Sequence, residues 1–373
     1  MKTTYLLLCL LGIGSVSGAG QTKQPQKIGD FIESTSYNEH RRNATRSLQY
    51  TPDGDDFVCI NGKNRFTRAL YGSHTAFRLE TSDRPVFAAY TKENPKHICF
   101  KLQTSGGTVA LDSTEHCESR YTAGRRSYSL SDPAFGGGSL SITTWALPDK
   151  EGAIWQFNAR NFKEFHPVLL ASISEIRNSK LNRNGDMGAD PAYSFEAPLQ
   201  PQQLQSFPVQ IDGTLYILLE NQELRTLTTA EGENLFKKAE AARSETASRI
   251  RIETPDPYFN TLGGTLAMAA DGIWDGEVWL HGAIGWRMPL SGWRAAYTGD
   301  VLGWHDRART HFNAYAASQV TEVPNTLPHP AQDSALHLAR SVKKWGTPQY
   351  SNGYICRNPH RNNQMHHYDM NLC

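Results

Sequence analysis

The segment from residue 271 to residue 308 concentrates side chains whose types and spacing could do chemistry. Its sequence, DGIWDGEVWLHGAIGWRMPLSGWRAAYTGDVLGWHDRA, holds five of the chain's eight tryptophans together with four aspartates and three arginines. A hydrophobic core accepts tryptophans but rejects unpaired charges, whereas an exposed face accepts charges but leaves tryptophans without apolar partners. A pyranose ring suits both, because its C–H face rests on an aromatic ring and its hydroxyls bond to polar side chains. Convergent polar groups on an aromatic floor are typical of a small-ligand pocket, so we interpret the segment as a candidate carbohydrate site.

The alternative interpretation is that these tryptophans pack helix ends together and that the charges pair with one another. Because aromatic and charged residues alternate along the segment, the ligand site is favoured. A second cluster, NPHRNNQMHHYDMN from 358 to 371, adds further histidines and an aspartate. Adjacent histidines need not share a metal, and no HExxH pattern accompanies them, so a metal site is the less favoured interpretation there.

The first twenty residues, MKTTYLLLCLLGIGSVSGAG, have the pattern of an export signal. A lysine near the start precedes an apolar run and then small residues, which predicts a signal peptide over 1–19. The apolar run is too short to span a bilayer. We therefore expect a secreted or periplasmic protein with no membrane span after cleavage, and a flexible polar lead-in over 20–47.

Composition restricts the classes of partner. The net charge is +1 with 20% charged residues, and the sequence contains no Lys/Arg block of the kind that indicates nucleic-acid binding. Five cysteines follow the signal peptide, without CxxC spacing, which argues against zinc. We expect mostly unpaired thiols, because a chain of this length is stable without disulfides. These five are Cys59, Cys99, Cys117, Cys356 and Cys373.

Residues 48–226 have the texture of strands. Runs rich in β-branched and aromatic residues, such as HICFKLQ, SLSITTWAL and TLYILLE, alternate with glycine-containing turns. About ten such runs without a helical period predict an antiparallel β-sandwich. The loop NRNGDMGAD at 182–190 offers oxygen ligands of the kind calcium prefers. Because it lacks the EF-hand pattern, a solvated turn is favoured over calcium, and we expect no cofactor.

The pattern becomes helical from residue 227 onward. Thr228 and Glu231 form a capping-box signature, which predicts a linker helix within 227–251. Asp256 and Pro257 then predict the start of another helix, followed by helices at 303–320 and 331–345. The expected inward-facing residues of the first and second of these later helices are Leu262, Leu266, Ala269, Ile273, Ala308, Phe312, Tyr315 and Ala316.

This order of parts resembles the six-hairpin glycosidases, whose catalytic domain is an (α/α)6 toroid. The closest resemblance is to exported bacterial proteins attributed to polysaccharide breakdown, which carry an N-terminal β-domain of unknown function. The architectural resemblance covers 48–373, and its motifs lie at 256–308, beginning PDPYFNTLGGTLAMAADGIW, and at 364–371. It implies a multidomain chain in which a β-sandwich and linker helix precede the first helices of the toroid, over 252–373.

The resemblance also implies roles for individual residues, because loops at the helix ends line the sugar pocket in toroidal glycosidases. The implied catalytic carboxylates are Asp300 and Asp306, followed by Asp271 and Asp275. The implied substrate-binding residues are Trp274, Trp286, Arg287, Trp293, Arg294, Trp304, His305, Arg307, His367 and Asp369.

A complete toroid needs on the order of 200 residues or more, and 123 residues follow Ile250. We therefore expect the N-terminal portion of a longer glycoside hydrolase, with an active site that this chain does not complete. One alternative is a non-catalytic carbohydrate-binding protein. A polysaccharide lyase, with Tyr297, His305 and Arg294 as its working residues, is a further alternative.

Overall fold

The computed structural model describes residues 50–63, 66–72, 77–91, 96–162, 166–175, 204–281, 292–319 and 355. The predicted signal peptide, lead-in, 182–190 loop, 331–345 helix and 358–371 cluster all lie outside these residues. Residues 49–373 cluster as one compact unit. No helix in the described ranges is long and apolar enough to cross a membrane.

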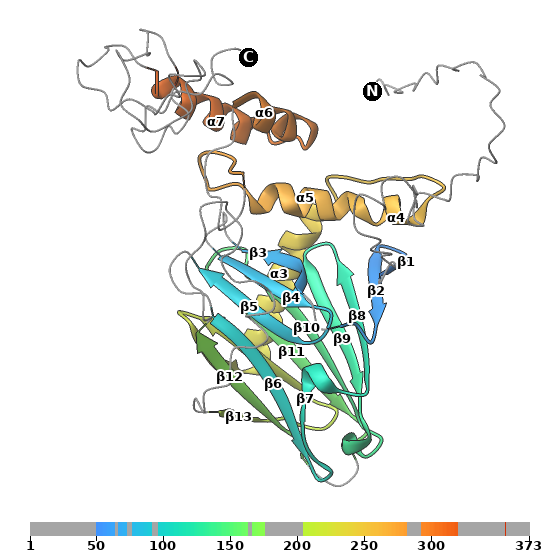
Figure 1. The fold of residues 1–373 in the computed structure, drawn as a ribbon. Coiled ribbons are helices and arrows are strands. Elements are labelled where there is room, and N and C mark those ends of the chain that lie inside the picture. Colours follow the sequence, from blue (N-terminus) through green and yellow to red (C-terminus); the bar gives the residue numbers. More distant parts are fainter. Residues whose placement is uncertain are drawn as a thin grey trace, which may run out of the picture. The chain divides into compact units, whose positions relative to one another are not determined.

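The first part of this unit is built from two antiparallel sheets (Figure 1). The eight-stranded sheet has the order β1 (Thr51–Asp53), β2 (Asp56–Ile60), β8 (His116–Thr122), β9 (Arg125–Ser131), β10 (Ser139–Ala146), β11 (Gly152–Arg160), β14 (Thr214–Glu220) and β15 (Glu223–Leu227). The seven-stranded sheet has the order β13 (Gln205–Pro208), β12 (Val168–Glu175), β6 (Lys96–Thr104), β5 (Val86–Thr91), β4 (Phe77–Ser82) and β3 (Phe66–Tyr71), with β7 (Gly107–Ala110) also paired to β6. The predicted β-rich, antiparallel architecture is confirmed.

Aromatic side chains from both sheets fill the space between them. Phe87 on β5 meets Trp155 on β11 edge-on, with ring centroids 5.4 Å apart. Phe100 on β6 meets Phe157 on β11 in the same way at 5.1 Å. Edge-to-face contacts of this kind stabilise a core beyond the area that they bury. The alternation of these residues with polar ones, visible in the sequence, is what places them in the interior.

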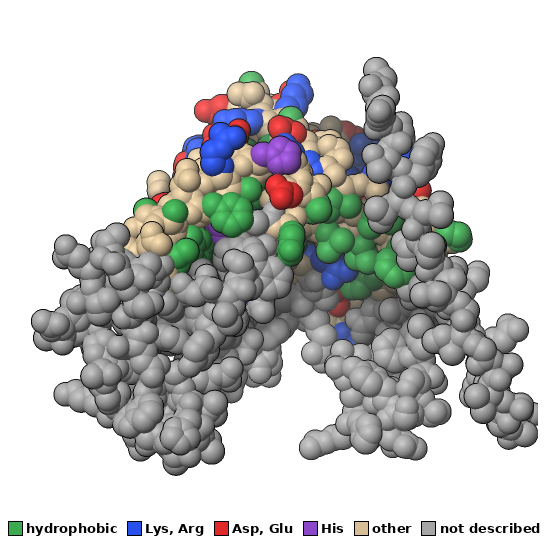
Figure 2. Space-filling model, turned by 90° about the horizontal axis from the view of Figure 1, so that it is seen from above, with side chains coloured by type: hydrophobic (Ala, Val, Ile, Leu, Met, Phe, Trp, Pro, Cys, Tyr) green, Lys and Arg blue, Asp and Glu red, His purple; other side chains and the backbone are tan. Residues whose placement is uncertain are grey.

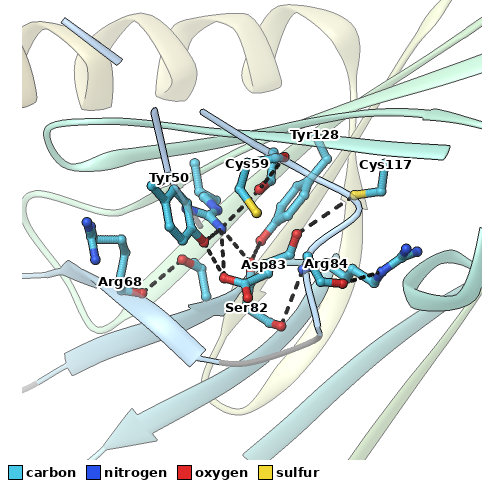
Figure 3. A network of polar contacts seen from close by, with 12 residues as sticks. Tyr50, Cys59, Arg68, Ser82, Asp83, Arg84, Cys117 and Tyr128 are labelled. Carbon is cyan, nitrogen blue, oxygen red and sulfur yellow. Dashed lines mark hydrogen bonds and ion pairs between the residues drawn. The ribbon is translucent and has the colours of Figure 1, made fainter. Parts of the chain in front are cut away.

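A buried ion pair joins the two sheets near one edge of the sandwich. Arg126 of β9 and Asp83, which follows β4, lie 3.9 Å apart, and neither side chain is exposed. Arg126 also donates hydrogen bonds to the Ser82 carbonyl and the Tyr50 hydroxyl, both at 2.8 Å. Figure 3 shows Tyr50, Asp83 and Tyr128 converging on this point, where the Tyr128 hydroxyl donates to the Ser82 carbonyl at 2.8 Å.

Arg84, the residue after Asp83, extends this hydrogen-bond network into the neighbouring loops. Arg84 donates from Nε to the Gly62 carbonyl at 2.9 Å and from Nη1 to the Thr114 carbonyl at 2.8 Å. The turn after β4 is therefore tied to the segments that follow β2 and precede β8. Arg84 is half-buried, and these backbone carbonyls satisfy its guanidinium where water does not reach it.

Replacement of Asp83 by alanine tests this contact between the sheets. The substitution leaves the Arg126 guanidinium buried without its carboxylate, so we expect the free energy of unfolding in urea to fall by about 3–5 kcal/mol. Asp53→Ala is the matched control, because Asp53 also pairs with an arginine, Arg120, but its side chain is 63% exposed. We expect that control to lose less than about 1 kcal/mol. Equal losses in the two variants would contradict a central role for the buried pair.

Helix α3 (Thr229–Ala247) lies on the outer face of the eight-stranded sheet. The predicted capping box is present, since the Thr228 hydroxyl accepts from the Glu231 amide and the Glu231 carboxylate accepts from the Thr228 amide. Gly232 allows the helix to approach β14 closely, because a Cβ at this position would lie 2.2 Å from Cγ of Tyr216. Strand β11 is consequently covered on both faces, and the consecutive residues 152–155 are all buried.

Glu240 fixes helix α3 on the sheet through three partners. Its carboxylate accepts from the Trp145 indole at 2.8 Å, from Arg243 at 2.6 and 2.9 Å, and from Arg125 at 3.3 Å. Burial opposes the ionisation of Glu240, but the hydrogen bonds from Arg243 and Trp145 outweigh this effect and lower its pKa. Arg243 in turn donates to the Ala123 carbonyl at 2.9 Å, so the β8–β9 turn joins the same contact.

Glu240→Ala should loosen this junction. We expect a loss of about 2–3 kcal/mol in the free energy of unfolding, because the substitution leaves the buried Trp145 indole and two arginines without their acceptor. Glu233→Ala on the same helix is the control, since Glu233 is 51% exposed and lies 3.9 Å from Lys237. Its expected loss is about 0.5 kcal/mol or less. Urea denaturation measures both variants, and a Glu240→Ala loss no larger than that of the control would contradict the junction.

Within the described residues, four further helices follow α3. They are α4 (Pro257–Asn260), α5 (Leu262–Gly272), α6 (Gly292–Val301) and α7 (His305–Ala317), while the one-turn helices η2 (Leu111–Ser113) and η3 (Pro133–Phe135) lie within the sandwich. The predicted cap at Asp256 is present.

The buried faces of α5 and α7 agree with the expected ones in part, since Ala308 and Tyr315 are buried as expected. Leu266 is 52% exposed and Phe312 is 48% exposed, whereas Met268 and His311 are buried. On α5 the packed face is set by Gly272, where a Cβ would lie 2.2 Å from Cγ of Tyr71 on β3. Close backbone approach therefore decides the orientation of α5, and the larger Leu266 faces outward.

Candidate functional site

The tryptophan segment begins with a tight loop after α5. Trp274 and Trp279 form an isolated antiparallel bridge, and their ring centroids lie 4.7 Å apart. The Asp275 carboxylate accepts from the amides of Glu277 and Val278 at 2.9 and 2.7 Å, which closes the turn. Asp275, one of the expected carboxylates, therefore holds the backbone of this loop.

Arginine side chains cover the tryptophan rings. The Arg307 guanidinium lies 4.3 Å from the centroid of Trp304 and 5.7 Å from that of Trp274, and it donates to the Asp271 carboxylate at 2.7 Å. Arg249, which follows α3, lies 5.2 Å from the Trp304 ring. Cation–π contacts and an ion pair thus join the charges of this segment to its aromatic rings.

The described tryptophans of the segment lie in a core cluster. Trp274 is 4% exposed, Trp279 is unexposed and Trp304 is 7% exposed. The Trp279 amide donates to Nδ1 of His311 at 3.2 Å, which joins this cluster to α7. Among the described residues, the tryptophan rings pack helix ends together, and the polar side chains of the segment lie around the edge of this cluster.

The exposed part of the segment lies at the end of α6 and the start of α7. His305 and Asp300 are 70% and 66% exposed, and Nδ1 of His305 lies 3.4 Å from Oδ1 of Asp300. Tyr297, three residues before Asp300 on α6, is 65% exposed and therefore lies on the same side of the helix. Asp306 is 93% exposed, pairs with Arg309 at 3.3 Å and occupies the first turn of α7, where a negative charge is stabilising.

This side of the protein, viewed from above in Figure 2, has histidine, acidic, basic and hydrophobic side chains close together. An aromatic ring, a carboxylate and an imidazole on one face can bind a hydroxyl-rich ligand and can transfer a proton to or from it. The structure thus brings together Asp300 and His305, and separately Trp274, Trp304, Arg307 and Asp271. Trp286, Arg287, His367 and Asp369 lie outside the described residues, and the side chains of Trp293 and Arg294 on α6 are likewise not described.

A cleft of about 720 Å³ lies where α3 ends beside the sandwich. Its walls come from the β1–β2 turn at Asp55, the end of β8 at Thr122, the last turns of α3 at Arg243 and the end of α4 at Asn260. The sequence carries no signal for this cleft, because these four segments are far apart along the chain. The pairing of β2 with β8 and the packing of α3 against α5 bring them together.

Metal binding and thiol chemistry find no support among the described residues. No group of three or more His, Cys, Asp or Glu side chains in this part of the chain could hold a metal ion. Cys99 lies 3.6 Å from Nδ1 of His97, but burial raises the pKa of Cys99 to about 12 and lowers that of His97 to about 4. Both groups are therefore neutral near pH 7, which disfavours a reactive thiolate. The described cysteines Cys59, Cys99 and Cys117 are free thiols.

Comparison with known proteins identifies one family match. Residues 95–249 match the family described as "Domain of unknown function (DUF4450)". The match runs from β6 through α3, so that family takes in the helix held by Glu240 together with much of the sandwich. No curated protein matches the chain.

Arg307→Ala tests the packing of the tryptophan cluster. We expect the free energy of unfolding to fall by about 1–2 kcal/mol, because the variant loses the Asp271 ion pair and the contact with the Trp304 ring. Arg309→Ala is the control on the same helix, since Arg309 is 72% exposed and its partner Asp306 is 93% exposed. The control should change the free energy by about 0.5 kcal/mol or less. Urea denaturation measures the free energy of unfolding of both variants. Denaturation midpoints that do not differ between Arg307→Ala and Arg309→Ala would overturn the packing role of Arg307.

Proposed function

We propose that this protein acts on carbohydrate as an exported glycoside hydrolase of the six-hairpin type. The order of parts supports the proposal: an antiparallel sandwich leads into α3, and the paired helices α6 and α7 follow beyond α5. In the proposal α6 and α7 belong to the first hairpins of an (α/α)6 toroid. The grouping of Tyr297, Asp300 and His305 on the exposed face of these two helices carries the proposal.

The chemistry of that face suits a sugar. The ring of Tyr297 offers an aromatic surface for the C–H face of a pyranose, and the Asp300 carboxylate accepts hydrogen bonds from its hydroxyls. Glycoside hydrolysis requires positioned carboxyl groups that serve as acid, base or nucleophile. We assign Asp300 and Asp306 to these roles, with His305 orienting the carboxylate of Asp300. Trp274, Trp304 and Arg307 form the packed floor of the site in this proposal, and Trp286, Arg287, Trp293 and Arg294 are assigned to substrate binding.

A second candidate function is carbohydrate binding without cleavage. The exposure of the two aspartates favours it, since Asp300 is 66% exposed and Asp306 is 93% exposed. A general acid in a glycosidase usually sits in a desolvated setting that keeps its carboxyl group protonated. A purely binding protein needs no such setting.

The release of reducing ends from polysaccharide-derived oligosaccharides tests hydrolysis directly. If the proposal is correct, the purified full-length protein cleaves at least one oligosaccharide, and Asp300→Asn lowers kcat by about 100-fold or more, because the amide cannot exchange the proton. Asp306→Asn is assayed in parallel. Glu245→Gln is the matched control, since Glu245 is a 78% exposed carboxylate on α3, and it should retain the full rate.

The outcomes separate the two candidates. Hydrolysis that is lost in Asp300→Asn or Asp306→Asn and retained in Glu245→Gln supports the enzyme. Binding of oligosaccharide without any hydrolysis contradicts the enzyme and supports the binding protein. Absence of both activities contradicts both candidates, and hydrolysis unchanged in all three variants contradicts the assigned carboxylates.

A further inference from the structure

The outer face of the eight-stranded sheet is divided into two parts. Helix α3 covers one part, where Trp145, Ile154 and Tyr216 form an apolar cluster with the helix. The other part, on β8 to β11, lies beyond this cluster and carries serine at alternate positions of two neighbouring strands. Alternate residues of a strand share one face, so these serines form a continuous polar surface.

A groove of about 480 Å³ lies on this second part of the face. Ser129 and Ser131 of β9 and Ser139 and Ser141 of β10 line its centre. His116 of β8 and Arg160 of β11 lie at its two sides. Because serine is small and the flanking residues are larger, the sheet surface is hollowed between them.

The strand register places these side chains in ordered rows. Ser141 is opposite Ser129 on one side and opposite Asn158 on the other. His116 is opposite Ser131, and Arg160 is opposite Ser139. Neighbouring strands lie about 4.8 Å apart, so Asn158, Ser141 and Ser129 offer regularly spaced amide and hydroxyl groups across three strands, and Glu118 of β8 is opposite Ser129.

The groups in the groove are available to a ligand. The hydroxyls of Ser129 and Ser141 make no hydrogen bond among the described residues, whereas Asn158 and Gln156 on the same face have partners. Asn158 has a fixed orientation, because Oδ1 accepts from Thr214 at 2.7 Å and the amide nitrogen is left as a donor. Gln156, one row further along, donates to the Tyr216 hydroxyl at 2.8 Å.

The groove is lined by a positive charge and, in the described part of the chain, by no negative one. Arg160 is exposed and pairs with no carboxylate among the described residues, and no aspartate or glutamate lines the groove. The neighbouring carboxylates are occupied, since Glu118 accepts from Arg120 at 2.5 Å and Asp132 accepts from the Ala134 amide at the start of η3. The groove is therefore complementary to a ligand that carries many hydroxyls and a negative charge.

We propose that this groove is a non-catalytic binding site for a uronic-acid-containing oligosaccharide. The serine hydroxyls and the Asn158 amide bind sugar hydroxyls, Arg160 binds a uronate carboxylate at one side of the groove, and His116 bonds to a sugar hydroxyl at the other side. The choice of a saccharide rests on the proposed function, whereas the site is separate from Asp300 and His305. The sandwich would then hold an acidic polysaccharide independently of the helices.

Isothermal titration with an oligogalacturonate tests the site, and its fully methyl-esterified form serves as the uncharged comparison. We expect the wild-type chain to bind the acid form, and Arg160→Gln to weaken its Kd about tenfold or more through the loss of a charge-assisted contact. The same variant should leave binding of the ester nearly unchanged. Ser141→Val, which removes a hydroxyl but suits a strand, should weaken the binding of both forms.

Arg225→Gln on β15 is the matched control, because Arg225 is 55% exposed and lies in the same sheet outside the groove. It should bind both oligosaccharides as the wild type does, and urea unfolding confirms that each variant is folded. Failure of the wild type to bind the acid form, or an unchanged Kd in both Arg160→Gln and Ser141→Val, would overturn the proposal.

The hydrolysis assay separates this inference from the proposed function. If the groove is correct and the hydrolase is wrong, the wild type binds oligogalacturonate through Arg160 but releases no reducing ends from any substrate. If the hydrolase is correct and the groove is wrong, Asp300→Asn abolishes hydrolysis while Arg160→Gln leaves the Kd unchanged.

Discussion

The carboxylate of Glu240 holds helix α3 on the sandwich, and the placement of the later helices depends on that contact. A single group accepts hydrogen bonds from Trp145 on the sheet and from Arg243 on the helix itself. Helix α3 then packs against α5, where a Cβ at Gly264 would lie 3.3 Å from that of Ala247. Beyond α3, Arg249 donates to the Leu302 carbonyl at 2.9 Å and so reaches the connection between α6 and α7. The sandwich thus positions α3, and α3 with the residues after it positions the helical segment.

The same helix also determines which surfaces remain for ligands. By covering the apolar part of the eight-stranded sheet, α3 leaves the serine-lined groove as the polar remainder of that face. By anchoring the later helices, it exposes Tyr297, Asp300 and His305. A protein with saccharide-binding groups on both its sandwich and its helices could hold a polymer on one surface and process it on the other. This arrangement unites the two proposals.

The sequence predicts the sandwich well, because strand formation follows from alternation over a few neighbouring residues. The capping box at Thr228 is local in the same way, and the structure contains it. The faces of α5 and α7 were predicted only in part, since close approach at Gly272 and the burial of His311 depend on partners distant in the sequence. The tryptophan segment shows the same limit: alternation of charge and aromatic rings is visible, but the stacking of Arg307 on Trp304 requires the fold. The serine alternation in β9 and β10 was a visible signal, and strand pairing was needed to join Ser129 with Ser141.

The proposed function requires carbohydrate to bind at the exposed face of α6 and α7. Amide hydrogen exchange, measured by mass spectrometry with and without the oligosaccharide that the chain binds best, tests this claim most directly. If carbohydrate binds there, amide exchange slows in peptides covering residues 297–307. A ligand on Tyr297, Asp300 and His305 stabilises the ends of both helices. Unchanged exchange in these peptides at a saturating oligosaccharide concentration would contradict this claim.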